Sequence, residues 1–191
     1  MKKKVKHHSK HFKEETEKLL QMPGISIWVN TYNDIFSSFD PRPYSQKALS
    51  DDFLSEIKKA SLDKDKGNVE LRFLIKKSER NLMEEHVIKK RLKHHFHKHF
   101  ALSKHDMKGL LIKGFSFTAF GIIIMFLAAF LLFKYQEATI LTSFLVILLE
   151  PAGWFLFWEG LDLIIFESKT IKPDLDFYEK MSKSKIQFLS Y

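Results

Sequence analysis

Two long apolar runs dominate the second half of the chain. Residues 110–133 contain a single charged residue, Lys113, and residues 138–158 contain a single one, Glu150. Each run is at least 20 residues long, and a helix of that length, rising 1.5 Å per residue, crosses about 30 Å of hydrocarbon. Only residues 134–137 separate the runs. We therefore predict two transmembrane helices that form a hairpin, with both of its ends on the same side of the membrane.

Three shorter segments, residues 25–32, 69–75 and 185–191, alternate apolar side chains with polar or small ones. This period of two is typical of β-strands. Two strands alone make a poor sheet, so we expect the last segment to return and pair with one of the first two, within one chain or between chains. Strands that are joined by a helix should run parallel, with a right-handed crossover.

Two helices are predicted before the first apolar run. Ser50 is suited to cap the first helix, and Asp51 and Asp52 follow in its first turn, where the helix dipole favours negative charge. The second helix should begin at Ser78 and run close to the first span. It carries an apolar stripe at intervals of four residues: Ile88, Leu92, Phe96 and Phe100.

This order of elements predicts an α+β membrane protein, written βαβα–TM–TM–β, in which a transmembrane hairpin is inserted into a small cytoplasmic α/β cap. We divide the chain into a basic lead rich in histidine and lysine (1–22), the cap (23–106), the hairpin (107–166) and a tail that supplies the last strand (167–191). The helix of the second span should extend to about residue 166. Pro173 is then expected to prevent it from continuing.

Positive charge next to the first span predicts the orientation of the protein. The net charge is +8, and residues 76–113 hold 11 lysines and arginines against 4 aspartates and glutamates. Since positive residues near span ends stay in the cytoplasm, we predict an inner-membrane, multi-pass protein with both termini cytoplasmic. The chain has no cysteine, which excludes disulfides, thiolate metal sites and a cysteine nucleophile.

Glu150 is the sharpest candidate for a site, together with Pro151 and Thr118. Glu150 lies about 18 Å into the second span, counted at 1.5 Å per residue, where a charge costs about 2.5–3.5 kcal/mol. Pro151 frees the carbonyl of Ile147 and bends the helix. Glu150 then either serves as a proton or cation site in a pore lining, or is a protonated carboxyl that holds the spans together through a hydrogen bond to Thr118 or to a neighbouring subunit.

Small and polar residues share one face of each span, which predicts close helix packing and self-association. In the first span this face holds Gly114, Thr118, Gly121 and Ala128. In the second span it holds Thr139, Ser143, Val146, Glu150, Gly153, Phe157 and Gly160.

Asp40 and Arg42 form a second candidate site, in the cap. Pro41 and Pro43 fix the backbone here, so residues 33–44 are predicted to form an ordered loop. Asp40 is expected to cap its own turn. For Arg42 we expect an ion pair with the following helix, at Asp51, Asp52 or Glu56. Such a loop either presents its charged residues for binding or packs its phenylalanines against the sheet.

The basic helix before the first span is predicted to contact anionic lipid headgroups, with about 1 kcal/mol per lysine or arginine near the surface. The residues concerned are Lys89, Lys90, Arg91, Lys93 and Lys98. Histidine pairs occur on the same helix, at His94/His97 and His95/His99, but no third ligand is fixed beside them. We therefore predict no metal, no cofactor and no nucleic-acid partner.

Two resemblances complete the sequence evidence. Arg80-Asn81 followed by His86 resembles the catalytic motif of HEPN ribonucleases over seven residues. Those enzymes are helical bundles, whereas this segment follows a strand, so we expect no ribonuclease site. Residues 39–54 and 148–162 resemble an uncharacterised group of small bacterial two-span membrane proteins, and this resemblance implies a bacterial membrane protein without implying an activity.

The favoured hypothesis is a homo-oligomeric, non-enzymatic membrane protein whose cytoplasmic cap binds a partner or ligand. One alternative is a subunit of a cation channel or transporter, with Glu150 from several chains forming a ring. A membrane-anchored enzyme that uses Asp40, Arg42 or the pair Arg80 and His86 is the other alternative.

Overall fold

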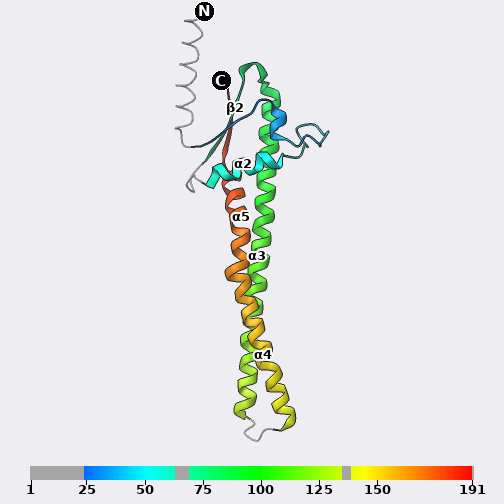
Figure 1. Ribbon diagram of the computed structural model, residues 1–191, viewed down its shortest axis with the longest axis vertical. Coiled ribbons are helices and arrows are strands. Elements are labelled where there is room, and N and C mark those ends of the chain that lie inside the picture. The colour runs from blue at the N-terminus through cyan, green and yellow to red at the C-terminus, as the bar shows by residue number, and fades with distance from the viewer. Residues whose placement is uncertain (1–23, 63–68, 135–138, 191) are drawn as a thin grey trace, which may run out of the picture. The chain divides into compact units, whose positions relative to one another are not determined.

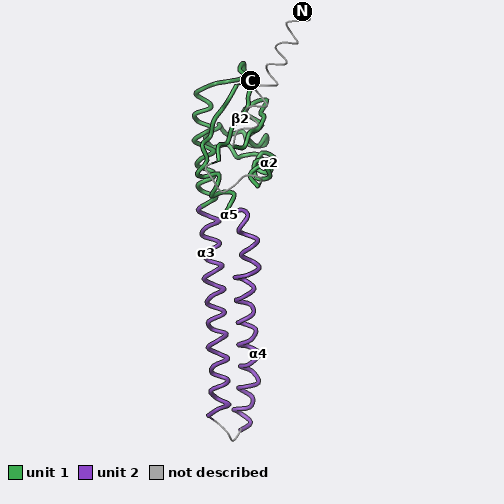
Figure 2. Tube along the Cα trace, turned by 90° about the vertical axis from the view of Figure 1, so that its left-hand side faces the viewer, with its two compact units in different colours: residues 1–100, 176–191 green, residues 101–175 purple. Residues whose placement is uncertain are grey.

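The computed structural model describes residues 24–62, 69–134 and 139–190, which are mostly helical with one small parallel sheet. Its strands and helices (Figure 1) are β1 (Ile25–Trp28), α2 (Asp51–Leu62), β2 (Glu70–Ile75), α3 (Leu82–Lys134), α4 (Ile140–Asp162), α5 (Ser168–Lys183) and β3 (Lys185–Ser190). The chain divides into two compact units, residues 1–100 with 176–191 and residues 101–175 (Figure 2). We call them the α/β unit and the helical unit.

The sheet of the α/β unit has the order β1-β2-β3, with both pairs of neighbours parallel. Phe73 of the central strand is in register with Ile27 on one side and with Phe188 on the other. The prediction that the last strand returns to pair with an earlier one is therefore confirmed, and the pairing is within the chain. The central position of β2 explains why Leu71 to Ile75 are buried on both faces rather than alternating.

The predicted end of the first strand and the predicted start of the second helix were wrong, because side-chain oxygens accept hydrogen bonds from backbone N–H groups at both places. The first strand ends at Trp28, since the Asp34 carboxylate accepts hydrogen bonds from the backbone N–H groups of Asn30 (2.7 Å) and Thr31 (3.2 Å). The helix expected from Ser78 begins instead at Leu82. The Asn81 side chain accepts a hydrogen bond from the N–H of Met83 at 3.0 Å, which is the contact of an N-cap residue.

Helices bury one apolar face each in the core of the α/β unit. The face of α2 contributes Phe53 and Ile57, and the predicted stripe of α3 is fully buried at Ile88, Leu92 and Phe96. Phe100, the last residue of that stripe, is half-buried. From α5 the core receives Phe177 and Met181.

A seam of small residues joins α3 and α4 in the helical unit. Its buried members recur every seven residues in both helices: Gly114, Gly121 and Ala128 in α3, and Val146, Gly153 and Gly160 in α4. A β-carbon on Gly121 would lie 2.5 Å from the backbone nitrogen of Phe157. The two backbones therefore touch without intervening side chains, as the small faces predicted. A strict seven-residue repeat is typical of left-handed supercoiling.

The expected helix break at Pro173 was wrong. The π-helical segment Leu163–Glu167 follows α4 directly, and α5 then continues through Pro173, so that Ile140–Lys183 is one helical stretch of 44 residues. Proline already has a helical φ and removes only one helix hydrogen bond. The burial of Phe177 and Met181 further along α5 offsets that loss.

The two long helices leave their apolar residues uncovered. Both are long and apolar enough to cross a membrane, and only 11% of the most apolar 18-residue window of each is buried. Phe115, Phe126 and Ile147 are among the side chains that are 62–75% exposed. The core helix of a soluble protein buries most of such a window, so these helices differ from it in this respect.

The seam predicts a sharp contrast between two glycines of α3. Gly121→Ala should lower the midpoint of thermal unfolding in detergent, because the new methyl group meets the α4 backbone and overpacking costs about 1–3 kcal/mol. Gly109→Ala is the matched control, since nothing lies within 4 Å of a β-carbon at that position. It should leave the midpoint unchanged or raise it, because alanine favours helix. Equal effects in circular-dichroism melts would contradict the seam.

Candidate functional sites

The loop between the 3₁₀ turn Tyr32–Ile35 and α2 is closed by backbone hydrogen bonds near both of its ends. The N–H of Ser37 donates to the carbonyl of Ala48 at 2.9 Å, and the N–H of Ser50 donates to the carbonyl of Ile35 at 3.1 Å. Phe36 and Leu49 form an antiparallel bridge between these contacts. The segment that we call the cap loop, residues 37–48, is therefore ordered, as the prolines predicted.

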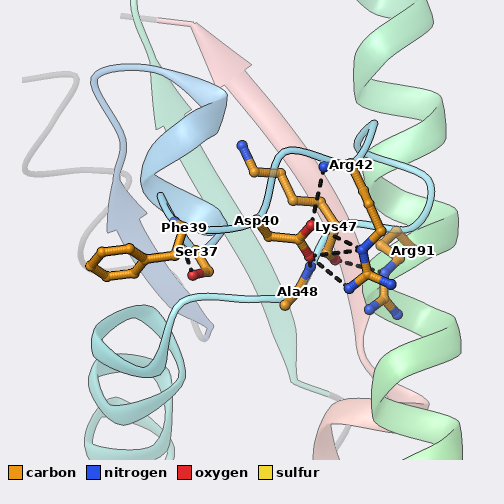
Figure 3. A network of polar contacts seen from close by, with 7 residues as sticks. All are labelled: Ser37, Phe39, Asp40, Arg42, Lys47, Ala48 and Arg91. Carbon is orange, nitrogen blue, oxygen red and sulfur yellow. Dashed lines mark hydrogen bonds and ion pairs between the residues drawn. The ribbon is translucent and has the colours of Figure 1, made fainter.

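Asp40 holds the interior of the cap loop together (Figure 3). Its carboxylate accepts the backbone N–H of Ala48 at 2.7 Å and a two-pronged contact from the Arg42 guanidinium, at 2.9 Å from Nε and 2.7 Å from Nη2. These bonds, that of Arg42 first, hold the pKa of the Asp40 carboxyl well below its ordinary value. The expected pairing of Arg42 with α2 was wrong, because Pro41 fixes a turn that brings Asp40 within reach at little entropic cost.

Further contacts attach the cap loop to the rest of the α/β unit. The Arg91 guanidinium donates from Nε to the carbonyl of Lys47 at 3.0 Å, as Figure 3 shows. The hydroxyl of Tyr44 donates to the side-chain oxygen of Asn33 at 3.1 Å, and its ring stacks on Phe36. The candidate charged residues of the loop therefore serve its architecture.

The most exposed large apolar side chain of the cap loop is that of Phe39, which is 96% exposed. Figure 3 shows its ring pointing away from the Asp40 and Arg42 cluster. Of the two roles predicted for this loop, Phe36 fits the packing of phenylalanines against the sheet, because it lies in the core of the α/β unit. Phe39 was missed as a site residue, because periodicity along the sequence does not mark a single loop side chain as exposed.

The HEPN-like residues are also used in structure. The Arg80 guanidinium forms a paired contact with the buried Glu85 carboxylate, at 2.8 and 2.9 Å, and Tyr32 donates its hydroxyl to the same carboxylate at 3.2 Å. The hydrogen bonds to Glu85 raise the pKa of Arg80, and burial raises the pKa of the Tyr32 hydroxyl. Asn81 caps α3, and His86 is exposed. Arg80 and Asn81 are therefore both engaged in contacts within the fold.

The basic residues of α3 divide into two groups. The ammonium of Lys89 lies over the ring of Phe188, 5.5 Å from its centre, and Arg91 is engaged with the cap loop. The side chains of Lys90, Lys93 and Lys98 are exposed. Contact of this helix with anionic lipid headgroups stays a prediction.

His95 and His99 pack beside Tyr178 of α5. Their ring centres are 4.2 Å apart, and the ring of His99 stacks on Tyr178 at 5.1 Å. Burial, followed by the positive neighbours, lowers the pKa of His95 to about 4, so this imidazole is neutral at physiological pH. Among the residues that the structure describes, no group of three or more histidines, aspartates and glutamates is placed to hold a metal ion.

Glu150 lies outside the seam between α3 and α4. Its side chain is exposed and lines an open hollow of about 520 Å³. The other lining residues are Met125, Ala129, Leu132, Pro151 and Trp154. We call these six residues the Glu150 flank.

The expected hydrogen bond between Thr118 and Glu150 is not formed. Thr118 donates instead to the carbonyl of Gly114, one turn back, at 2.9 Å, and packs against Gly160. Gly160 is ten residues, or about 15 Å, along α4 from Glu150. Thr118 and Glu150 therefore lie at different depths along the helix pair, although each was predicted on the small-residue face of its own helix.

The chain matches no family model, no curated protein sequence and no solved structure. The function proposed below therefore rests on the geometry of its own residues.

The Asp40 contacts predict a pH-dependent contribution to stability. Because the pKa of this carboxyl is lower in the folded chain, its stabilising effect is complete above the ordinary aspartate value of about 3.9 and is lost as the pH falls further. Asp40→Asn should therefore unfold at a lower temperature than wild type at pH 7, with a difference that shrinks below about pH 4.

Thermal unfolding of the whole protein in detergent, followed by circular dichroism at several pH values, measures this difference. Asp52→Asn is the matched control, because Asp52 is exposed and makes no side-chain hydrogen bond in the described part of the chain. If both variants lose the same stability with the same pH profile, the role of Asp40 in holding the loop is refuted.

Proposed function

We propose that this chain is an integral membrane protein, anchored by a hairpin of α3 and α4, whose α/β unit is a non-enzymatic binding module. The observation that carries the proposal is the 11% burial of two helices that are long and apolar enough to cross a membrane. Soluble monomers seldom expose a contiguous apolar surface of more than a few hundred Å². A hydrocarbon environment removes the cost of exposing these side chains.

The orientation follows from charge. Lysines and arginines before the first span outnumber acidic residues by 11 to 4 between residues 76 and 113, which favours a cytoplasmic position for the α/β unit and both termini. The membrane that we propose is a bacterial inner membrane. In this account the hairpin turn faces the opposite side.

A binding role accounts best for the chemistry of the α/β unit. Asp40, Arg42 and Arg80 are all engaged in ion pairs or hydrogen bonds that maintain the fold. The cap loop meanwhile holds the ring of Phe39 in solvent on a backbone fixed by those bonds. An exposed aromatic side chain on an ordered backbone is a common anchor of protein interfaces, because little backbone entropy is lost on binding.

Membrane topology tests the proposal directly, because the natural chain has no cysteine. We expect a Lys134→Cys variant to react with a membrane-impermeant maleimide in intact cells, since Lys134 ends α3 next to the turn. A Ser78→Cys variant, exposed in the α/β unit, should react only after the membrane is opened. Equal reactivity of both variants in intact cells, or recovery of both in the soluble fraction, would overturn the proposal.

The binding role has a separate test at Phe39. Phe39→Ser should leave the unfolding temperature unchanged, because the ring is 96% exposed. If the cap loop anchors a protein partner, affinity purification from cells should retain with wild type a protein that this variant loses. Leu62→Ser serves as the control, since it also removes an exposed apolar side chain (74%) from the α/β unit. Identical sets of retained proteins would contradict the role of the loop.

A further inference from the structure

We propose that a second copy of this chain docks on the Glu150 flank, in a two-fold interface within the membrane. The interface would pair the Glu150 carboxyl of each copy with the Trp154 indole N–H of the other. This inference rests on the proposed membrane insertion and goes beyond it, because it assigns Glu150 to a contact between two chains rather than to a pore or to the hairpin seam.

The first support is the position of the two polar groups. Glu150 and Trp154 are one turn apart on α4, and both are exposed on the flank that the seam leaves free, with 57% exposure for Trp154. Within the described residues, neither the carboxyl nor the indole N–H has a hydrogen-bond partner. The remaining lining side chains, Met125, Ala129, Leu132 and Pro151, carry no hydrogen-bonding group that suits a carboxyl.

The second support is the cost of leaving these groups without partners. Lipid chains offer no hydrogen bond, so intramembrane carboxyls face a protein surface or a water-filled cavity in nearly all cases. We assign the partner to another chain, because the lining side chains around Glu150 other than Trp154 offer no polar group. Pro151 adds to this demand, because it has no N–H to bond the carbonyl of Ile147.

The third support is that the flank is complementary to itself. It holds one acceptor, Glu150, and one donor, the Trp154 indole N–H. A two-fold axis between two copies forms both contacts at once. Glu150 of each copy then meets Trp154 of the other. Beside them the hollow of about 520 Å³, lined in part by Ala129, offers space for the partner's Trp154 ring. No third molecule is needed to satisfy either group.

Single-cysteine cross-linking in native membranes tests the interface with two neighbouring positions. Ile147 and Leu148 are both exposed, at 70% and 55%, and differ by about 1.5 Å in depth. On a helix Ile147 lies about 60° from Glu150, whereas Leu148 lies about 160° from it. Under mild oxidation we expect disulfide-linked dimers from the Ile147→Cys variant and little dimer from the Leu148→Cys variant.

Substitutions in the Ile147→Cys background test the chemistry. Glu150→Leu and Trp154→Phe each remove the proposed hydrogen bonds and should lower dimer formation about 5- to 30-fold, the range expected for one or two such bonds in a membrane. Glu150→Gln keeps an acceptor and should retain most of the dimer. Matched expression and membrane recovery of the variants show that the hairpin still inserts.

Four results would overturn the proposal. Equal cross-linking at both positions would indicate chance collisions, and cross-linking at position 148 alone would place the interface on the other side. Cross-linking that is unaffected by Glu150→Leu would remove the carboxyl from the contact, and cation flux that Glu150→Gln abolishes would make it a pore residue. If the Lys134→Cys labelling succeeds while cross-linking fails, the membrane proposal stands and only the interface is lost.

Discussion

The direct contact of two helix backbones along the seam of small residues governs the helical unit. Because Gly121, Gly153 and their heptad neighbours place almost no side chain between α3 and α4, the bulky apolar residues of both helices must point outward. A water-soluble protein would need another layer to cover them. Here the pairing depends on close packing rather than on burial of large side chains, which is the mode of association that a lipid environment favours.

The α/β unit satisfies a different constraint, since its central strand is buried on both faces and needs a neighbour at each edge. β1 supplies one neighbour from before the long helices and β3 supplies the other from after them. The hairpin is thus an insertion between the second and third strands of one sheet. The same unit fixes its cap loop through one carboxylate, Asp40, which binds both a guanidinium and a backbone N–H. Fixing this loop keeps Phe39 in a defined exposed position.

Periodicity along the sequence was sufficient to predict the strands, the buried stripe of α3 and the two apolar helices, because each of these depends on spacing within one segment. Contacts between different segments were harder to predict. The sequence placed Glu150 and Thr118 on the small-residue faces of their helices. Their positions along the helix pair depend on the register of α3 against α4, which the sequence pattern does not give. Several acidic residues lie near Arg42 in the sequence, and the nearest one, Asp40, forms the pair because its turn is fixed. Phe39 gave no periodic signal, since a loop residue is placed by the bonds around it.

Alkaline carbonate extraction of membranes from expressing cells tests the central claim, that the apolar surfaces of α3 and α4 lie in lipid. Peripheral proteins dissociate in such a wash, whereas proteins whose helices cross the bilayer stay in the pellet until detergent is added. If both helices cross the bilayer, the chain remains in the pellet and is released by detergent alone. Quantitative release into the carbonate supernatant, as a folded protein, would contradict it.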